Sequence, residues 1–215
     1  MTSEIIFFRL KLHRLNHGKT ATIWPMKIIG TSGTNGSGKD TVGEILAEKY
    51  NYLFVSVSDL LRMECRKRGI AVSRENLRMV SAEWRREFGL GVLVDKAVEL
   101  AQNAQKQYDG VVASPMRNVA EAQHLRDIGG TLVWIDADPH LRYERIRSAN
   151  RGRADEDNKT YEEFLAEEAA EMHPSDPTDP SVLNMAGVKV LADVTILNES
   201  DLPSLEKAIE VVFKS

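Results

Sequence analysis

A glycine-rich stretch that ends in a lysine is the part of this sequence best suited to chemistry. Four residues separate Gly33 from Gly38, and Lys39 follows directly, which is the spacing of a phosphate-binding loop. Glycines allow successive backbone N–H groups to turn toward one phosphate, and a lysine can reach it as a point charge. A short apolar run at residues 26–29 precedes the stretch, and a helical pattern follows it. The sequence therefore predicts a nucleotide-phosphate site between a strand and a helix.

The expected ATP-binding residues in this stretch form one continuous segment. They are Gly33, Thr34, Asn35, Gly36, Ser37, Gly38, Lys39, Asp40 and Thr41. The strict phosphate-loop pattern has Ser or Thr directly after the lysine, whereas here Asp40 takes that position and Thr41 follows. We expect these two side chains to lie beside the Mg²⁺ ion that accompanies ATP. The expected cofactors are therefore ATP and Mg²⁺.

Composition and charge narrow the class of protein. The chain has 215 residues, of which 42% are hydrophobic and 28% are charged, and this fits one globular α/β domain. A net charge of −4 gives no general reason to expect nucleic acid or an anionic membrane as a partner. The expected partner is a small-molecule nucleotide, bound by a monomer or a homodimer. The single Cys65 excludes an internal disulfide, and no apolar run approaches about 20 residues, so we expect a cytoplasmic protein.

The chain divides into a short N-terminal extension and one domain. Residues 1–25 carry several basic side chains against a single acidic one, Glu4. We expect this extension to be disordered and to take no part in catalysis. An organelle transit peptide is the alternative interpretation of the same segment. Residues 26–215 are expected to form the catalytic domain.

Alternating strand and helix patterns predict the fold class. The expected strands are residues 26–29, 53–57, 111–114, 131–135 and 193–197. Helical patterns separate them, which predicts a three-layer α/β/α fold of the P-loop type with a five-stranded, mostly parallel sheet. Ligands of such sheets bind beyond the carboxyl ends of the strands. The phosphate loop, residues 58–62, Arg117 and Asp136 all follow strand ends, so we expect them to converge on one crevice.

Residues 26–214 resemble the P-loop nucleoside monophosphate kinases. The loop looks like that of adenylate kinases, and its Lys39-Asp40-Thr41 end is similar to that of deoxynucleoside monophosphate kinases. Ser58-Asp59-Leu60-Leu61-Arg62 looks like the family's acceptor-binding segment, and Met116-Arg117 is similar to its acceptor-phosphate arginine. The resemblance implies an ATP-dependent phosphotransferase that phosphorylates a nucleoside or deoxynucleoside monophosphate.

The resemblance also implies acceptor-binding helices at about 58–107 and an arginine-rich lid at about 147–160. The implied substrate-binding residues are Asp59, Arg62, Arg85 and Arg117. The implied catalytic residues are Lys39, Arg117 and, from the region of the lid, Arg145, Arg151 and Arg153. Asn198, after the last strand, is the implied neighbour of the adenine of ATP. Arginines suit these positions because they bind phosphate oxygens bidentately and keep their charge.

Some of these basic side chains also fit structural roles. Arg62 is one of several basic residues on its helix, which suits a solvated helix face as well as a phosphate site. Arg85, on the predicted helix around Trp84, is equally compatible with binding the acceptor and with a structural role. Arg142 and Arg147 are expected to pair with Glu144 or Asp155.

One departure from the family pattern concerns magnesium. The resembling kinases place an aspartate at the end of the third strand, where this chain has Ala113-Ser114-Pro115. We expect Asp40, Asp59 or Asp136 to substitute for it through water molecules, because Mg²⁺ keeps much of its hydration.

Two alternative functions remain open at the level of sequence. A dephospho-CoA kinase would share the fold and the pattern of residues 192–198, and its hydroxyl acceptor would need a carboxylate base near Asp59. A nucleotide-binding regulator that has lost catalysis would explain Ala113 and the missing hydroxyl at position 40. The segment after the second strand favours the nucleoside monophosphate kinase over the dephospho-CoA kinase.

Overall fold

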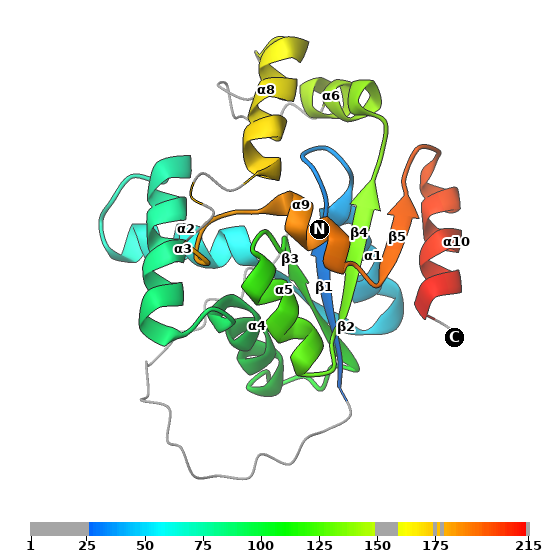
Figure 1. Cartoon of the computed structure of the whole chain (residues 1–215). Helices are drawn as coiled ribbons and strands as arrows, with labels where there is room; N and C mark the ends of the chain where they lie inside the picture. Colours follow the sequence, from blue (N-terminus) through cyan, green and yellow to red (C-terminus); the bar gives the residue numbers. More distant parts are fainter. Residues whose placement is uncertain (1–25, 149–158, 174–175, 177–178, 214–215) are drawn as a thin grey trace.

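The computed structural model describes residues 26–148, 159–173, 176 and 179–213. The expected N-terminal extension lies outside these residues, as does most of the expected lid, including Arg151 and Arg153. The described residues form a central sheet with helices on both of its faces (Figure 1).

Short, largely apolar strands form the sheet. They are β1 (Lys27–Ser32), β2 (Tyr52–Ser56), β3 (Gly110–Ser114), β4 (Thr131–Asp136) and β5 (Val194–Leu197). Their order is β2-β3-β1-β4-β5, and all neighbouring strands are parallel. The predicted three-layer α/β/α fold with a five-stranded sheet is therefore confirmed. Because β1 is the central strand, the phosphate loop that follows it lies in the middle of the row formed by the carboxyl ends of the strands.

Helices connect the strands and cover the sheet. The described helices are α1 (Lys39–Tyr50), α2 (Val57–Lys67), α3 (Arg74–Phe88), α4 (Val92–Gln102), α5 (Val119–Asp127), α6 (Pro139–Ser148), α8 (Tyr161–Met172), α9 (Met185–Leu191) and α10 (Leu202–Phe213). The short helix α9 had no counterpart among the expected elements.

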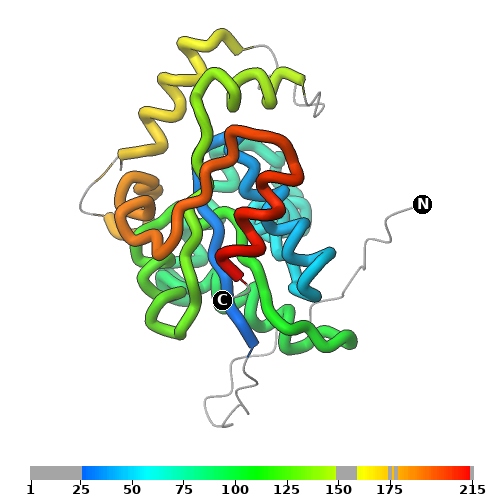
Figure 2. The backbone as a smooth tube through the Cα atoms, turned by 90° about the vertical axis from the view of Figure 1, so that its right-hand side faces the viewer, coloured from blue at the N-terminus to red at the C-terminus, as the bar shows by residue number. Residues whose placement is uncertain are grey.

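The two faces of the sheet belong to two separate hydrophobic clusters. On β3, Val111 and Ala113 pack into one cluster, whereas Val112 between them packs into the other. The first cluster contains apolar residues of α2, α3, α4, α5 and α9, and the second contains those of α1 and α10 (Figures 1 and 2). Burial on both faces explains why the strands are continuous apolar runs without alternation.

Helices α6 and α8 lie beyond the carboxyl ends of the strands, above the sheet in Figure 1. Aromatic rings join them, because Tyr143 of α6 lies 5.3 Å from Tyr161 and 5.7 Å from Phe164 of α8 between ring centroids. Phe164 is buried. This packing holds α8 over the edge of the sheet where the phosphate loop lies.

Candidate active site

The phosphate loop turns on glycines whose backbone angles other residues rarely adopt. The φ angle is +148° at Gly33, +79° at Gly36 and +91° at Gly38. Gly38 precedes α1 and provides no side-chain hydrogen bond to it, whereas Ser56, Ser73, Asn118 and Thr160 cap their helices in this way. Amides in the first turn of a helix have no acceptor within the helix, so those of α1 suit an anion.

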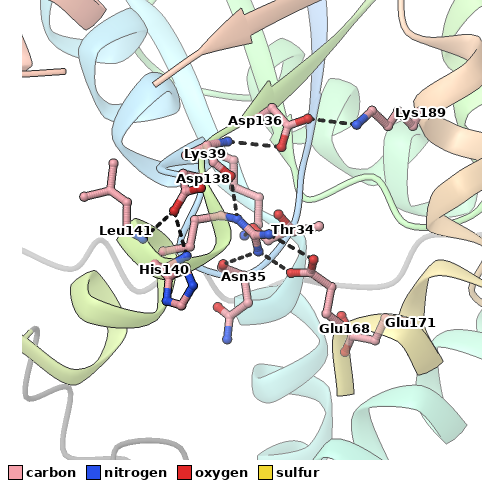
Figure 3. A network of polar contacts seen from close by, with 12 residues as sticks. Thr34, Asn35, Lys39, Asp136, Asp138, His140, Leu141, Glu168, Glu171 and Lys189 are labelled. Carbon is pink, nitrogen blue, oxygen red and sulfur yellow. Dashed lines mark hydrogen bonds and ion pairs between the residues drawn. The ribbon is translucent and has the colours of Figure 1, made fainter. Parts of the chain in front are cut away.

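Two hydroxyls of the loop fit the same kind of ligand. Thr34 Oγ1 and Ser37 Oγ are buried and have no hydrogen-bond partner among the described residues. Buried polar groups almost always have partners, so an orphan pair in this loop fits a ligand that carries phosphate oxygens. Lys39, at the first position of α1, is only 8% exposed, and its Nζ donates to the carbonyl oxygen of Thr34 at 3.5 Å (Figure 3).

Neighbouring elements hold the loop in this shape. Asn198, which follows β5, donates from Nδ2 to the carbonyl oxygen of Ser37 at 2.8 Å, and it is buried. Arg142 of α6 donates from Nη1 to the carbonyl oxygen of Asn35 at 3.3 Å. The contact of Asn198 is thus with the loop backbone, and its role beside adenine stays a prediction.

A cavity of about 190 Å³ opens beside the loop, at the ends of β2 and β3. The expected site residues that line it are Asn35, Lys39, Asp40, Arg62, Arg85 and Arg117. The charged lining residues that the sequence did not single out are Arg74, Arg78 and Glu171. The cavity therefore brings the lysine of the loop together with several guanidinium groups, an arrangement suited to a ligand that carries more than one anionic group.

Hydrogen bonds to β1 fix the position of Arg117. The backbone N–H of Met116 donates to the carbonyl oxygen of Thr31 at 2.8 Å, and Ser32 Oγ donates to the carbonyl oxygen of Met116 at 2.6 Å. The next residue, Arg117, donates from Nη1 to Glu171 of α8 at 2.7 Å. Backbone contacts at the carboxyl ends of two adjacent strands thus place this guanidinium at the cavity.

The segment after β2, which the resemblance predicts to bind the acceptor, presents Arg62 to the cavity. Arg62 donates from Nη1 to Oδ1 of Asp59 at 2.6 Å, one turn earlier on α2. The Asp59 side chain is 63% exposed, and it is not among the described residues that line the cavity. The geometry therefore brings only one of these two predicted residues to the site.

Arg85 lines the cavity and is also part of a buried ion pair. Its Nη2 lies 3.0 Å from Oε2 of Glu121 on α5, and both side chains are almost fully buried. Its Nη1 donates to Ser81 Oγ at 2.6 Å and to the carbonyl oxygen of Ser181 at 3.1 Å. Burial raises the pKa of Glu121 above its usual value. The charge and hydrogen bond of Arg85 act in the opposite direction but do not cancel this effect. This is the arrangement of a side chain that joins α3 to α5.

Arg142 differs from expectation in its partner. It pairs with both carboxylate oxygens of Glu168 on α8, with 2.9 Å between Nη2 and Oε1, and it is only 2% exposed. Its Nε also donates to the carbonyl oxygen of Ala137 at 2.9 Å. Among the described residues its carboxylate partner is therefore Glu168 and not Glu144, because a bidentate partner from α8 reaches the buried guanidinium, and Asp155 lies outside the part of the chain that the structure describes.

Of the three arginines assigned a catalytic role near the lid, Arg145 lies within the described residues. Arg145 is half-buried on α6, and its Nη1 is buried with no hydrogen-bond partner among the described residues. Arg151 and Arg153 lie outside the part of the chain that the structure describes. The roles assigned to these three side chains stay predictions.

Asp40 is the carboxylate best placed for a magnesium ion. It lines the cavity next to Lys39, and its Oδ1 accepts a hydrogen bond from Oγ of Ser114, at the end of β3, at 3.2 Å. This is the strand end where the resembling kinases have an aspartate. No cluster of three or more His, Cys, Asp or Glu side chains suited to a metal occurs in the described ranges.

Asp136 lies apart from the cavity. At the end of β4 its carboxylate accepts hydrogen bonds from Nζ of Lys189 at 2.8 Å and from the N–H of Ala137 at 3.1 Å (Figure 3). Burial alone would raise the pKa of Asp136, but the hydrogen bond and charge of Lys189 outweigh it and lower the pKa below its usual value. Asp136 is absent from the described residues that line the cavity, so the expected convergence does not include it.

Three charged residues of the cavity were missed from the sequence. Arg74 and Arg78 are one turn apart on α3, and their spacing was the signal that could have placed both on one face. Glu171 is one of several acidic residues on α8, and nothing in its local sequence distinguishes it from them.

Solved structures with this fold include two bacterial shikimate kinases. The enzyme from Bacteroides thetaiotaomicron has a TM-score of 0.55 and 16% identity over 88% of this chain and 97% of its own. The enzyme from Acinetobacter baumannii, in complex with shikimate, has a TM-score of 0.51 and 18% identity over 88% and 94%. At these identities the likeness concerns the fold, which is that of P-loop kinases.

Sequence comparisons show the family. A family model described as an AAA domain matches residues 32–162. A UPF0200 protein of Pyrococcus abyssi is 32% identical over 191 residues, which cover 87% of this chain and 95% of the relative. Another from Methanococcus maripaludis is 26% identical and covers 88% and 97%. The chain therefore belongs to the AAA-domain family of that model and to the UPF0200 family of these relatives.

A separate observation concerns membranes. Among the helices that the structure describes, none has the length and apolar character needed to span a bilayer.

Proposed function

We propose that this protein is an ATP-dependent phosphotransferase whose acceptor is a nucleoside or deoxynucleoside monophosphate. The observation that carries the proposal is the single cavity that Lys39 shares with Arg62 and Arg117. Phosphoryl transfer between two nucleotides brings several negative charges together, so catalysis consists largely of aligning and neutralising them. A cavity with a phosphate loop on one side and arginines on the other supports both tasks.

The proposal gives each group one task. Lys39 and the loop amides hold the donor phosphates, while Arg62 and Arg117 hold the phosphate of the acceptor. Arg145, together with Arg151 and Arg153, stabilises the transferring group and helps to exclude water. The acceptor oxygen already belongs to an anionic phosphate, so the reaction needs no general base.

Mg²⁺ would be held beside Asp40 and Thr41, and when bound it supplies charge neutralisation between the β- and γ-phosphates of ATP. Of the three carboxylates considered for this role, Asp40 alone lines the cavity among the described residues. Asp59 is held by Arg62 and Asp136 by Lys189. We therefore assign to Asp40 the place of the missing aspartate of β3, acting through water.

A hydroxyl acceptor is the second candidate, because the solved neighbours include shikimate kinases and the fold also suits a dephospho-CoA kinase. Such an acceptor needs a carboxylate base. The carboxylate expected for that purpose, Asp59, is exposed and paired with Arg62. Asp40 and Glu171 are the carboxylates that do line the cavity. Asp40 follows Lys39 at the end of the phosphate loop, and Glu171 pairs with Arg117.

A panel of acceptors separates these functions. ADP release from ATP is measured with nucleoside and deoxynucleoside monophosphates, dephospho-CoA and shikimate. We expect turnover with at least one monophosphate. Turnover with dephospho-CoA or shikimate alone would replace the proposal by a hydroxyl kinase. ATP binding without transfer to any acceptor would replace it by a nucleotide-binding regulator.

Arg117→Ala tests the acceptor side of the cavity. A hydrogen bond to a charged group is worth about 1.5–3 kcal/mol, so we expect the KM for the acceptor to rise by about 10- to 100-fold with little change in the KM for ATP. The matched control is Arg126→Ala on α5, where the arginine pairs with Asp193 away from the cavity. An unchanged acceptor KM in Arg117→Ala would remove Arg117 from the site.

A further inference from the structure

A carboxylate of α8 lies among three arginines of the cavity. Oε2 of Glu171 is 2.7 Å from Nη1 of Arg117, and its Oε1 is 3.7 Å from Nη1 of Arg74 and from Nη2 of Arg78. The Glu171 side chain is 17% exposed, so the contact is partly withdrawn from water. Two elements supply the arginines, because α3 carries two of them and the third follows β3. The carboxylate of Glu171 therefore faces three positive charges.

This cluster differs from the ion pairs that hold the fold together. Arg85 and Glu121 form a one-to-one pair that is almost fully buried, and Arg142 grips both oxygens of Glu168. At Glu171, by contrast, one guanidinium of three lies within hydrogen-bond distance. Arg74 also pairs with Glu167 at 3.4 Å, so among the described residues three guanidinium groups face two carboxylates.

A phosphate monoester matches this cluster better than a carboxylate does. It offers three terminal oxygens and close to two negative charges, and guanidinium groups bind such oxygens in bidentate fashion. The cluster also borders the phosphate loop, because Glu168 and Glu171 of α8 line a small pocket together with Asn35 of the loop (Figure 3).

We propose that Glu171 is an internal competitor that occupies the phosphate subsite of the acceptor and leaves it when a phosphate binds. The inference rests on the proposed function, because it takes the cavity to bind an acceptor phosphate. In the absence of ligand, Glu171 offsets the mutual repulsion of the three arginines and keeps them gathered. A phosphate then replaces the carboxylate without rebuilding the site.

The helix need not detach for this exchange. Glu168 anchors α8 through Arg142, and Phe164 anchors it through burial against α6. Glu171 lies one residue before the end of α8, so a change of its side-chain rotamer is enough to withdraw the carboxylate.

The test is a calorimetric titration with inorganic phosphate at constant ionic strength. All variants carry Lys39→Ala, which weakens phosphate binding at the loop. In this background we expect Glu171→Gln to bind phosphate about tenfold more tightly than the parent, the effect of removing one adjacent charge. Glu171→Asp, which withdraws the charge by one methylene, should lie between the two. Added Arg117→Ala should abolish the gain.

The matched control is Glu167→Gln, one turn earlier on α8. Glu167 contacts Arg74 at 3.4 Å and Lys159 at 2.7 Å, and it does not line the cavity of Arg117 among the described residues. We expect its phosphate affinity to stay within about twofold of the parent.

If both Glu171→Gln and Glu171→Asp bound phosphate no more tightly than the parent, the proposal would be overturned. Glu171 would then be a structural residue that holds α8 in place. An equal gain in Glu167→Gln would also overturn it, since loss of any negative charge beside the arginines would then be enough and Glu171 would have no special place. The titration uses neither ATP nor turnover. It therefore tests the role of Glu171 even if the protein transfers phosphate to none of the acceptors.

Discussion

Asp40 stands where the phosphate-loop pattern has a hydroxyl, and its carboxylate accepts a hydrogen bond from Ser114 at the end of β3. We propose that this one side chain compensates for two departures from the pattern. In this proposal Asp40 replaces the aspartate missing from the end of β3, and it does so from the position where the hydroxyl is missing.

The first prediction concerns this carboxylate. Asp40→Asn should raise the Mg²⁺ concentration that half-saturates ATP binding by about tenfold, because groups that orient metal-bound water contribute that much to metal affinity. Calorimetric ATP titrations at several Mg²⁺ concentrations measure it. Ser114→Ala, which leaves the carboxylate in place, should shift the Mg²⁺ midpoint less. An unchanged midpoint in Asp40→Asn would assign the ion to another group.

The second prediction concerns pH. The pKa of Asp136 is lower in the folded protein than in the unfolded chain, where Asp titrates near about 3.9. The stabilisation from its contact with Lys189 is therefore complete above about pH 4 and is lost as the pH falls through the folded pKa. Lys189→Met keeps an unbranched apolar side chain but removes the ammonium group, and with it both the contact with Asp136 and the position of Nζ 5.3 Å from the centroid of the Trp134 ring.

At pH 7 we expect Lys189→Met to lower the free energy of unfolding by at most about 1 kcal/mol, because the lysine is nearly half exposed. As the pH falls from about 4 through the lowered folded pKa of Asp136, the difference between the two proteins should shrink. Denaturant unfolding of both proteins between pH 3 and pH 7, chosen to bracket about 4, provides the comparison. A stability difference that stays constant over this range would contradict the assignment.

At the scale of the element, the buried pair of Arg85 and Glu121 joins α3 to α5 beneath the cavity. Arg85→Met leaves Glu121 buried without its cation, and we expect a loss of about 3–5 kcal/mol in the free energy of unfolding. The double variant Arg85→Met/Glu121→Leu should recover most of it. Urea denaturation measures both.

Arg62→Met is the comparison for this pair. Arg62 forms an exposed contact with Asp59, and its loss should cost no more than about 1 kcal/mol. If Arg85→Met proved as stable as the wild type while the KM for the acceptor rose, Arg85 would be a substrate ligand and not a structural side chain.

The strands and most helices were predictable because their signals are local. Each strand contains a short apolar run, and several helices begin with a capping side chain such as Ser73 or Thr160. The short helix α9 was not predictable, since seven residues carry too few turns to display a period.

At the scale of the whole molecule, the site joins segments that are distant in sequence. Lys39 and Asp40 could be predicted from glycine spacing, and Arg62 and Arg117 from their places after strands. Glu171 could not, because its contact with Arg117 depends on how α8 lies across the end of the sheet. The partner of Arg142 was missed for the same reason: a carboxylate 26 residues away reaches it only through the packing of α6 against α8.

The central claim is that the loop amides and Lys39 hold the phosphates of ATP, and calorimetric titration of the purified protein with ATP and Mg²⁺ tests it most directly. We expect saturable binding by the wild type and at least about a tenfold loss in Lys39→Ala, since a charge-assisted phosphate contact is removed. Lys27→Ala, at the opposite end of β1, should bind as the wild type does. A wild type that shows no affinity for ATP, or a Lys39→Ala variant that binds it equally well, would contradict the account.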